Sequence, residues 1–178
     1  MYIITGNNHK LEEYRNFFPD ISSKQLDMPE IQSLDELVIQ DFKIAEAKKH
    51  ISQDFIVDDV AFYLDCLDGL PGPFIKWFNQ TIKPIGLYQL AEQKGNFKAS
   101  ARCVVSYVDK SGLITHFQSN IPGRVVSPVS SVGFGFDTIF IPEGMCKTYS
   151  EMSVSEKNLC SHRGVAMQKL ATALSQKL

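Results

Sequence analysis

Residues 5–10, TGNNHK, constrain the fold of this chain most strongly, because they join an expected strand to an expected helix. A strand, a glycine turn and a helix N-terminus together present free backbone N–H groups and the positive end of the helix dipole to an anion. Lys10 could reach the same anion, which suggests a phosphate. The stretch lacks the full P-loop pattern. On its own it is more simply interpreted as an ordinary strand–helix turn capped by Asn7 or Asn8.

Hydrophobic periodicity and turn residues predict the remaining elements. We expect strands at residues 1–5, 55–57, 98–109, 113–120 and within the Gly- and Pro-punctuated region 122–141, and helices at 9–18, 33–52, 79–93 and 155–178. Pro19 stops the first helix, and Pro84 interrupts the third. Ser33 with Glu36 three residues later is a capping box at the start of the long second helix. This order predicts a mixed α/β protein, and with 178 residues a single domain is the default.

The composition is that of an ordinary globular protein and excludes several functional classes. A hydrophobic content of 44% is enough for a sizeable core, and a net charge of −2 gives no general attraction to nucleic acid or to acidic membranes. The four cysteines form no C-x-x-C pair, so neither a zinc site nor thioredoxin-type chemistry is expected. No apolar run reaches the length of a membrane span and no leader precedes the first strand, so we expect a cytoplasmic protein with reduced thiols.

Asp58 and Asp59 follow the buried strand predicted at residues 55–57. Ligand sites of open α/β sheets gather at that edge. Neighbouring residues on a strand point to opposite faces, so we expect only one of the two carboxylates to enter a site. Mg²⁺ prefers oxygen ligands and needs only one or two carboxylates besides water and phosphate oxygens, so Asp59 and a distant Glu30 would make a suitable pair. From these residues alone, two solvated turn acids are the simpler interpretation.

Residues 133–137, GFGFD, combine two glycines, two aromatic residues and an acid. Such a loop can expose the ring of Phe134 or Phe136 for stacking on a base, while Asp137 accepts hydrogen bonds from ring N–H groups. A β-bulge with core aromatic residues explains the same pattern equally well. Lys43, on the expected long helix, is a further phosphate candidate, although an isolated lysine usually lies in solvent.

Lys157 and the triplet Ser161, His162 and Arg163 bring four donor-capable side chains close to a helix start. Their natural partner is an acceptor such as a carbonyl or phosphate oxygen, although an exposed polar helix turn would look the same. Serine hydrolase chemistry is excluded, because adjacent helix residues do not face each other and the chain has no G-x-S-x-G elbow.

Taken together, five segments resemble the inosine triphosphate pyrophosphatase family, whose members cleave non-standard purine nucleoside triphosphates. In chain order they are TGNNHKLEE, MPEIQS, FIVDDVAFYLDCLDGLPGPFIKWF, VGFGFDTIF and YSEMSVSEKNLCSHRGVA, and they span residues 5–166. The resemblance implies a homodimeric, Mg²⁺-dependent enzyme that releases pyrophosphate from ITP, dITP and XTP and leaves the monophosphate. It also implies a mixed α/β fold with an elongated central mixed β-sheet, flanking helices and two lobes around a nucleotide cleft.

The resemblance further implies roles for particular residues. The family's phosphate loop falls on Thr5, Gly6, Asn7 and Lys10. Its helix lysine falls on Lys43, although the segment before it is two residues longer here, and its metal-binding acids fall on Glu30 and Asp59. Its base pocket falls on Phe134, Phe136, Asp137, Lys157, Ser161, His162 and Arg163. Thr138 stands where a proline is common and Phe136 where Tyr or Trp is common, which leaves the fine shape of the base pocket open.

Under this hypothesis Mg²⁺ assists the attack of water on the α-phosphorus, and Asp59 orients that water, with Asp58 as the alternative. Lys10 and Lys43 would bind phosphate oxygens. Donors in the base pocket would favour the 6-carbonyl of hypoxanthine and xanthine over the amino group of adenine. Two competing interpretations are a septum-inhibitor-type pyrophosphatase acting on modified pyrimidine triphosphates, and a nucleotide sensor without turnover. A nucleic-acid-binding domain lacks support, because the chain has no basic patch.

Overall fold

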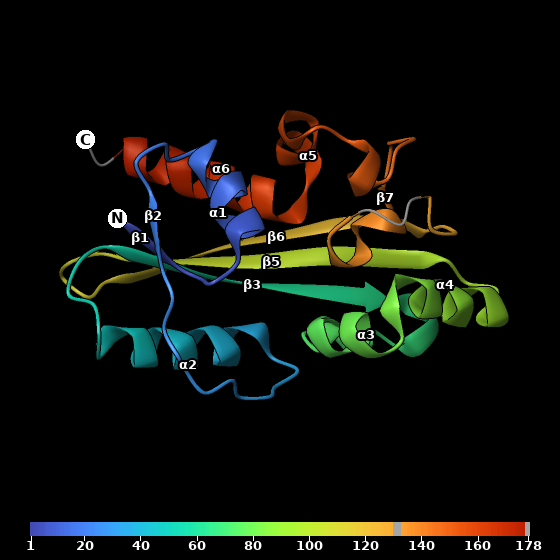
Figure 1. Cartoon of the computed structure of the whole chain (residues 1–178), viewed down its shortest axis with the longest axis horizontal. Coiled ribbons are helices and arrows are strands. Elements are labelled where there is room, and N and C mark those ends of the chain that lie inside the picture. Colours follow the sequence, from blue (N-terminus) through green and yellow to red (C-terminus); the bar gives the residue numbers. More distant parts are fainter. Residues whose placement is uncertain (130–132, 177–178) are drawn as a thin grey trace. The chain divides into compact units, whose positions relative to one another are not determined.

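The computed structural model describes residues 1–129 and 133–176 and has a mixed α/β fold (Figure 1). Its strands are β1 (Tyr2–Ile4), β2 (Ser22–Lys24), β3 (Phe55–Leu64), β4 (Pro71–Gly72), β5 (Lys98–Val108), β6 (Ile114–Val125) and β7 (Phe140–Pro142). Its α-helices are α1 (Asn8–Arg15), α2 (Glu36–Lys48), α3 (Ile75–Thr81), α4 (Lys83–Lys94), α5 (Val154–Cys160) and α6 (His162–Ser175). Short 3-10 helices are η1 (Asp65–Leu67), η2 (Gly135–Thr138) and η3 (Tyr149–Glu151).

The strands of the described residues form one seven-stranded sheet in the order β2-β1-β3-β5-β6-β7, with β4 beside β3. β1 runs parallel to both β2 and β3, whereas the pairs β3–β4 and β6–β7 are antiparallel. The expected mixed sheet is therefore confirmed.

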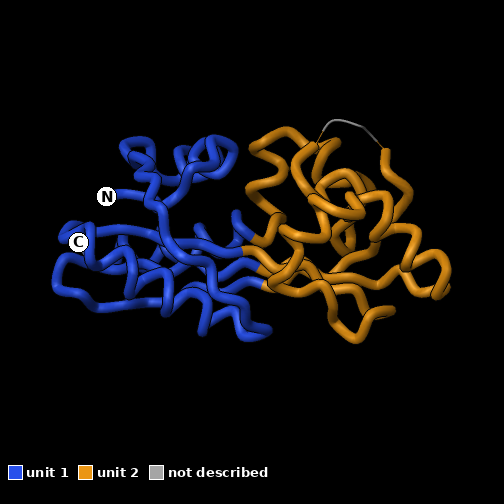
Figure 2. The backbone as a smooth tube through the Cα atoms, turned by 60° about the horizontal axis from the view of Figure 1, so that its bottom comes forward, with its two compact units in different colours: residues 1–59, 103–119, 163–178 blue, residues 60–102, 120–162 orange. Residues whose placement is uncertain are grey.

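The chain divides into two compact units, each built from separate segments of the sequence (Figure 2). Unit 1 comprises residues 1–59, 103–119 and the segment from 163 onward, and unit 2 comprises residues 60–102 and 120–162. The division falls inside β3, β5 and β6, so each of these strands contributes residues to both units. His162 and Arg163, although adjacent in sequence, consequently belong to different units.

In unit 1, α1 and α6 lie on one face of the strands and α2 lies on the other (Figure 1). The parallel strand β1 and the first residues of β3 are thus covered on both sides, which explains why they are continuously apolar rather than alternating. Ile44 and Ala47 of α2 pack with Phe55 and Val57 of β3 in one buried cluster.

The core of unit 2 is aromatic. Phe62 of β3 stacks on Phe136 with ring centroids 4.3 Å apart, and Phe140 meets Phe62 edge-on at 5.4 Å. The ring of Tyr149 lies 5.3 Å from that of Phe140. Leu87 of α4 joins the same buried cluster. Pairs of aromatic rings in these geometries stabilise a core beyond their area of contact.

The first strand and the β5–β6 hairpin agree with the sequence prediction. The first helix forms as predicted but ends at Arg15, before the stop expected at Pro19. In the hairpin turn the Gly112 N–H donates to the Asp109 carbonyl at 2.8 Å, and the Asp109 carboxylate accepts from the Ser111 N–H at 2.8 Å. Gly112 has a φ of +88°, a conformation that glycine adopts without steric cost.

Two predictions near the candidate site are wrong. β3 does not end at Asp58 and Asp59 but continues to Leu64, since antiparallel pairing with β4 extends it. The helix α2 begins at Glu36, and its cap is Asp35, whose carboxylate accepts from the Leu37 N–H at 2.9 Å. Ser33 instead accepts from the Asp35 N–H at 3.0 Å, so the predicted capping box at Ser33 does not form.

The later helices also differ from prediction. The break expected near Pro84 is present, at Ile82 between α3 and α4, but α3 begins at Ile75, before the predicted start. Pro84 itself lies in the first turn of α4, where a missing N–H is harmless. The expected C-terminal helix is interrupted at Ser161, whose ψ of 157° is extended. Within the β region expected at 122–141, strands occur only at the two ends of the described part, η2 lies between them, and residues 130–132 fall outside that part. No helix of the described chain is long and apolar enough to cross a membrane.

Candidate active site

The turn after β1 is held by its own side chains. Asn7 caps α1, because its Oδ1 accepts from the His9 N–H at 2.9 Å. The Thr5 hydroxyl accepts from the Asn7 N–H at 3.1 Å, and the Thr5 N–H donates to the Lys24 carbonyl at 3.1 Å. Of the two cap candidates, Asn7 is thus the one used. The cap leaves the expected strand–turn–helix geometry intact, so the turn retains the features of an anion site.

Asp58 is the centre of a buried ion network in unit 1. Its Oδ1 bonds Lys10 Nζ at 2.8 Å and its Oδ2 bonds Arg163 Nε at 2.7 Å, while Arg163 Nη1 also pairs with Glu13. Only 4% of Asp58 and 5% of Arg163 are exposed. Burial raises the pKa of Asp58, but the charges of Lys10 and Arg163 outweigh burial and hold that pKa well below its ordinary value. Asp58 is therefore an ionised carboxylate with both oxygens occupied.

Asp59 points to the other side of β3, as expected for adjacent strand residues. Its Oδ2 bonds Lys43 Nζ of α2 at 2.6 Å, and 31% of its side chain is exposed. Among the described residues no second hydrogen bond reaches this carboxylate, so Oδ1 remains available to a ligand. Of the two neighbouring acids, Asp59 is the accessible one.

Glu30 lies exposed in the segment between β2 and α2. Both Glu30 and Asp59 are reachable carboxylates, and hard carboxylate oxygens are what Mg²⁺ binds. Two such carboxylates, both in unit 1, suit by their chemistry a magnesium ion that keeps waters and substrate oxygens as its remaining ligands. In the described part of the chain, no group of three or more His, Cys, Asp or Glu side chains gathers as a metal cage.

Unit 2 carries the aromatic and donor residues predicted for base recognition. Lys157 Nζ bonds Asp137 Oδ2 at 2.7 Å, in a pair whose side chains are 13% and 10% exposed. Phe136 is buried against Phe62, so it takes the core role that sequence left open, whereas Phe134 is 52% exposed. The ring offered to solvent by this loop is thus that of Phe134. Thr138 is buried and packs against Gly133. A Cβ added at Gly133 would lie 2.5 Å from the Thr138 Cγ2.

The Ser161–His162–Arg163 triplet lies at the break between α5 and α6. Ser161 is buried at the extended position between the helices, and the His162 ring lies 5.5 Å from that of Phe136 and 5.8 Å from that of Tyr149. Arg163 belongs instead to unit 1, where it is paired with Asp58 and Glu13. The structure thus brings Phe136, Asp137, Lys157 and His162 together in unit 2, and brings Arg163 together with Lys10 in unit 1.

Sequence reasoning missed Glu13 and Phe62. Glu13 lies three residues after Lys10 on α1, so helical spacing could have placed both on one face. Phe62 lies in the family segment FIVDDVAFYLDCLDGLPGPFIKWF. No pattern within that segment predicts its contact with Phe136, more than seventy residues later.

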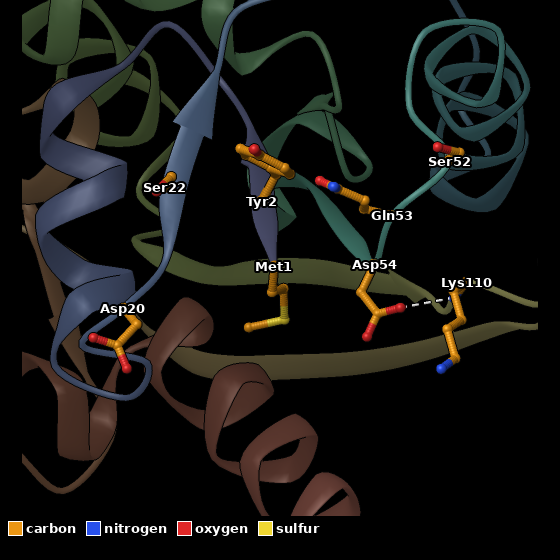
Figure 3. Close-up of a pocket in the computed structure, with 8 residues that line it drawn as sticks. All are labelled: Met1, Tyr2, Asp20, Ser22, Ser52, Gln53, Asp54 and Lys110. Atoms are coloured by element: carbon orange, nitrogen blue, oxygen red, sulfur yellow. Dashed lines mark hydrogen bonds between the residues drawn. The ribbon is translucent and has the colours of Figure 1, made fainter.

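A pocket of about 490 Å³ in unit 1 lies elsewhere (Figure 3). Met1, Tyr2, Ser22 and Asp54 line it, at the beginnings of β1, β2 and β3. The phosphate loop follows the other end of β1, which is the carboxyl end where open α/β sheets bind ligands. None of the predicted site residues lines this pocket.

Comparison with known proteins identifies the family of this chain. Residues 1–173 match the Ham1 family. The inosine triphosphate pyrophosphatase of Schizosaccharomyces pombe is 37% identical over 179 residues, which cover 98% of this chain and 94% of that protein. Inosine triphosphate pyrophosphatase 2 of Trypanosoma cruzi is 37% identical over 173 residues, which cover 94% of this chain and 88% of that protein.

Solved structures show the same fold. The Ham1 protein of Staphylococcus aureus has a TM-score of 0.82 at 23% identity and covers 99% of this chain and 98% of its own. A HAM1 protein of Coxiella burnetii has a TM-score of 0.82 at 22% identity and covers 98% of both chains. With a family match over residues 1–173 and relatives 37% identical over nearly the whole sequence, this chain belongs to the Ham1 family.

Proposed function

We propose that this chain hydrolyses non-standard purine nucleoside triphosphates, ITP, dITP and XTP, to the monophosphate and pyrophosphate. The observation that carries the proposal is the pair of lysine–carboxylate contacts in unit 1, Lys10 with Asp58 and Lys43 with Asp59. They put two cations and one accessible acid in the unit that also holds the anion-binding turn. Family membership and two relatives named inosine triphosphate pyrophosphatase support the same reaction.

Asp59 is the residue that orients the attacking water in this proposal. The alternative, Asp58, has both carboxylate oxygens occupied by Lys10 and Arg163 and a lowered pKa, so it is a poor acceptor for a proton from water. Asp59 is accessible, and its Oδ1 is available to accept a hydrogen bond from water. Lys43 holds the Asp59 side chain in place, and Lys10 and Lys43 keep further N–H donors for phosphate oxygens, since each ammonium has three.

Glu30 and Asp59 would hold Mg²⁺. When bound, the ion neutralises triphosphate charge and polarises the phosphorus centre. The protein's own contribution is positioning and charge, which is most of what phosphoryl transfer requires.

Base recognition is proposed for unit 2. The exposed ring of Phe134 offers a stacking surface, and the Lys157–Asp137 pair and His162 offer donors and an acceptor at its side. A 6-carbonyl accepts from those donors. The 6-amino group of adenine would leave them without acceptors, which should weaken reaction with adenine nucleotides by orders of magnitude.

We also propose that residues 1–178 act as one domain, that the enzyme is a homodimer and that it works in the cytoplasm. Three strands that contribute to both units support the single domain. The thiols Cys66, Cys103, Cys146 and Cys160 are all free, which suits a reducing compartment. Analytical ultracentrifugation would test the dimer.

Pyrophosphate release from ITP, XTP, GTP, ATP and dTTP, with Mg²⁺ and again with EDTA, tests the proposal. We expect metal-dependent release from ITP and XTP and little from ATP. Preferential release from a modified pyrimidine triphosphate would support the septum-inhibitor-type alternative. Tight binding of ITP in calorimetry without any release would instead support a sensor.

A further inference from the structure

The parallel pairing of β1 with β2 brings a residue outside the predicted site onto the phosphate loop. Tyr2, Ile3 and Ile4 lie opposite residues 22–24, and the Thr5 N–H donates to the Lys24 carbonyl. One step further along both strands, Gln25 must run beside the glycine turn. All of these residues belong to unit 1.

The Gln25 carboxamide lies directly over Gly6. A Cβ added at Gly6 would come within 2.9 Å of Gln25 Cδ, 3.0 Å of Oε1 and 3.2 Å of Nε2. The whole amide head, rather than one atom of a long side chain, thus covers this face of the turn. Gly6 is the residue that leaves room for it.

Gln25 is nevertheless an exposed residue. Leu26 and Met28, which follow it, turn inward and pack against the core of unit 1. This alternation holds Gln25 on the outer side of the chain, at the start of the segment that leads to Glu30.

Three of the polar side chains of the turn, those of Thr5, Asn7 and Lys10, already have partners within the protein. Thr5 accepts from the Asn7 N–H, Asn7 caps α1, and Lys10 bonds Asp58. Within the residues that the structure describes, the Gln25 carboxamide makes no hydrogen bond, so both of its N–H donors are available.

We propose that Gln25 is a further substrate-binding residue, which donates a hydrogen bond from Nε2 to an oxygen of the triphosphate. This inference rests on the proposed function and names one more contact of the same site. A neutral amide suits this position, because it supplies donors without the repulsion that an acid would bring.

The test compares Gln25→Glu and Gln25→Ala with the wild type and with Gln53→Glu. Gln53 is an exposed residue of the same unit at the pocket of Figure 3, so this control adds the same charge away from the phosphate loop. Two readouts are used, the KM for ITP and the Kd for inorganic tripolyphosphate, which has no base. Thermal melts confirm that each variant is folded.

Loss of one hydrogen bond to a charged group predicts a rise of about ten-fold in both constants for Gln25→Ala. Gln25→Glu keeps the shape and adds a like charge, so its rise should be at least about ten-fold. That rise should shrink with added salt, which a purely structural defect would not show. Gln53→Glu should stay within about two-fold of wild type.

Unchanged tripolyphosphate binding in Gln25→Glu would overturn the inference, as would equal weakening in Gln53→Glu or no tripolyphosphate binding by the wild type. If wild type binds tripolyphosphate through Gln25 but releases no pyrophosphate from any triphosphate, the proposed reaction fails while the role of Gln25 in binding stands.

Discussion

Replacing Asp58 with asparagine should destabilise the protein severely. The carboxylate is 4% exposed and accepts from Lys10 at 2.8 Å and from Arg163 at 2.7 Å. Asp58→Asn removes the charge from both contacts and directs an amide N–H at one of the two cations. Arg163, itself 5% exposed, would keep only its pair with Glu13 among the ion pairs of the network. Breaking one side of a buried ion pair costs about 3–5 kcal/mol.

For a chain of this size each kcal/mol shifts the melting temperature by roughly 2–4 °C, so Asp58→Asn should melt roughly 6–20 °C below wild type. Calorimetry and urea denaturation would measure the loss. Asp20→Asn, at an exposed acid of the same unit, is the matched control and should melt with the wild type. A loss of less than about 2 °C for Asp58→Asn would refute the view that this ion network stabilises unit 1.

The pH dependence gives a second check. The folded-state pKa of Asp58 lies below its ordinary value of 3.8, so its stabilisation is fully present above that value and is lost as the pH falls through the folded-state pKa. The gap in unfolding free energy between wild type and Asp58→Asn should therefore stay constant from roughly pH 8 to pH 5 and narrow only below about pH 4.

Four further substitutions test which residues act in the reaction and which stabilise the fold. Asp59→Asn should lower kcat for ITP by about 10²–10⁴-fold without changing the melting temperature, and near-normal turnover would contradict the role of Asp59. Phe134→Ala should raise the KM for ITP by about ten-fold, through lost stacking, at little cost in stability. Phe136→Ala should instead lose about 3–5 kcal/mol of unfolding free energy, and equal melting curves for the two phenylalanine variants would contradict this division. Ser106→Ala should cost about 1–3 kcal/mol in urea denaturation, because the buried Ser106 hydroxyl donates to Gln40 at 3.0 Å, and an unchanged midpoint would mean that this bond contributes nothing.

Local features of the site were well predicted from the sequence. The strand–turn–helix at residues 5–10 forms with Asn7 as the cap, and Asp58 and Asp59 face opposite sides of their strand. These predictions succeed because helix caps and the alternation of side chains along a strand depend only on residues a few positions apart. The exposed Phe134 and buried Phe136 could not be told apart, since glycine on either side of Phe134 permits both arrangements.

The strand–turn–helix at residues 5–10, the β5–β6 hairpin and the resemblance to the family follow from the sequence alone. Tertiary structure decided the partners: which acid is occupied and which is open, where Arg163 bonds, and which residue lies over Gly6. Arg163 meets Asp58 across more than one hundred residues, and Gln25 meets Gly6 only because two short strands run parallel in a particular register. Such contacts depend on how strands pair and helices pack. The spacing of residue types within one segment does not predict them, because their partners lie in distant segments.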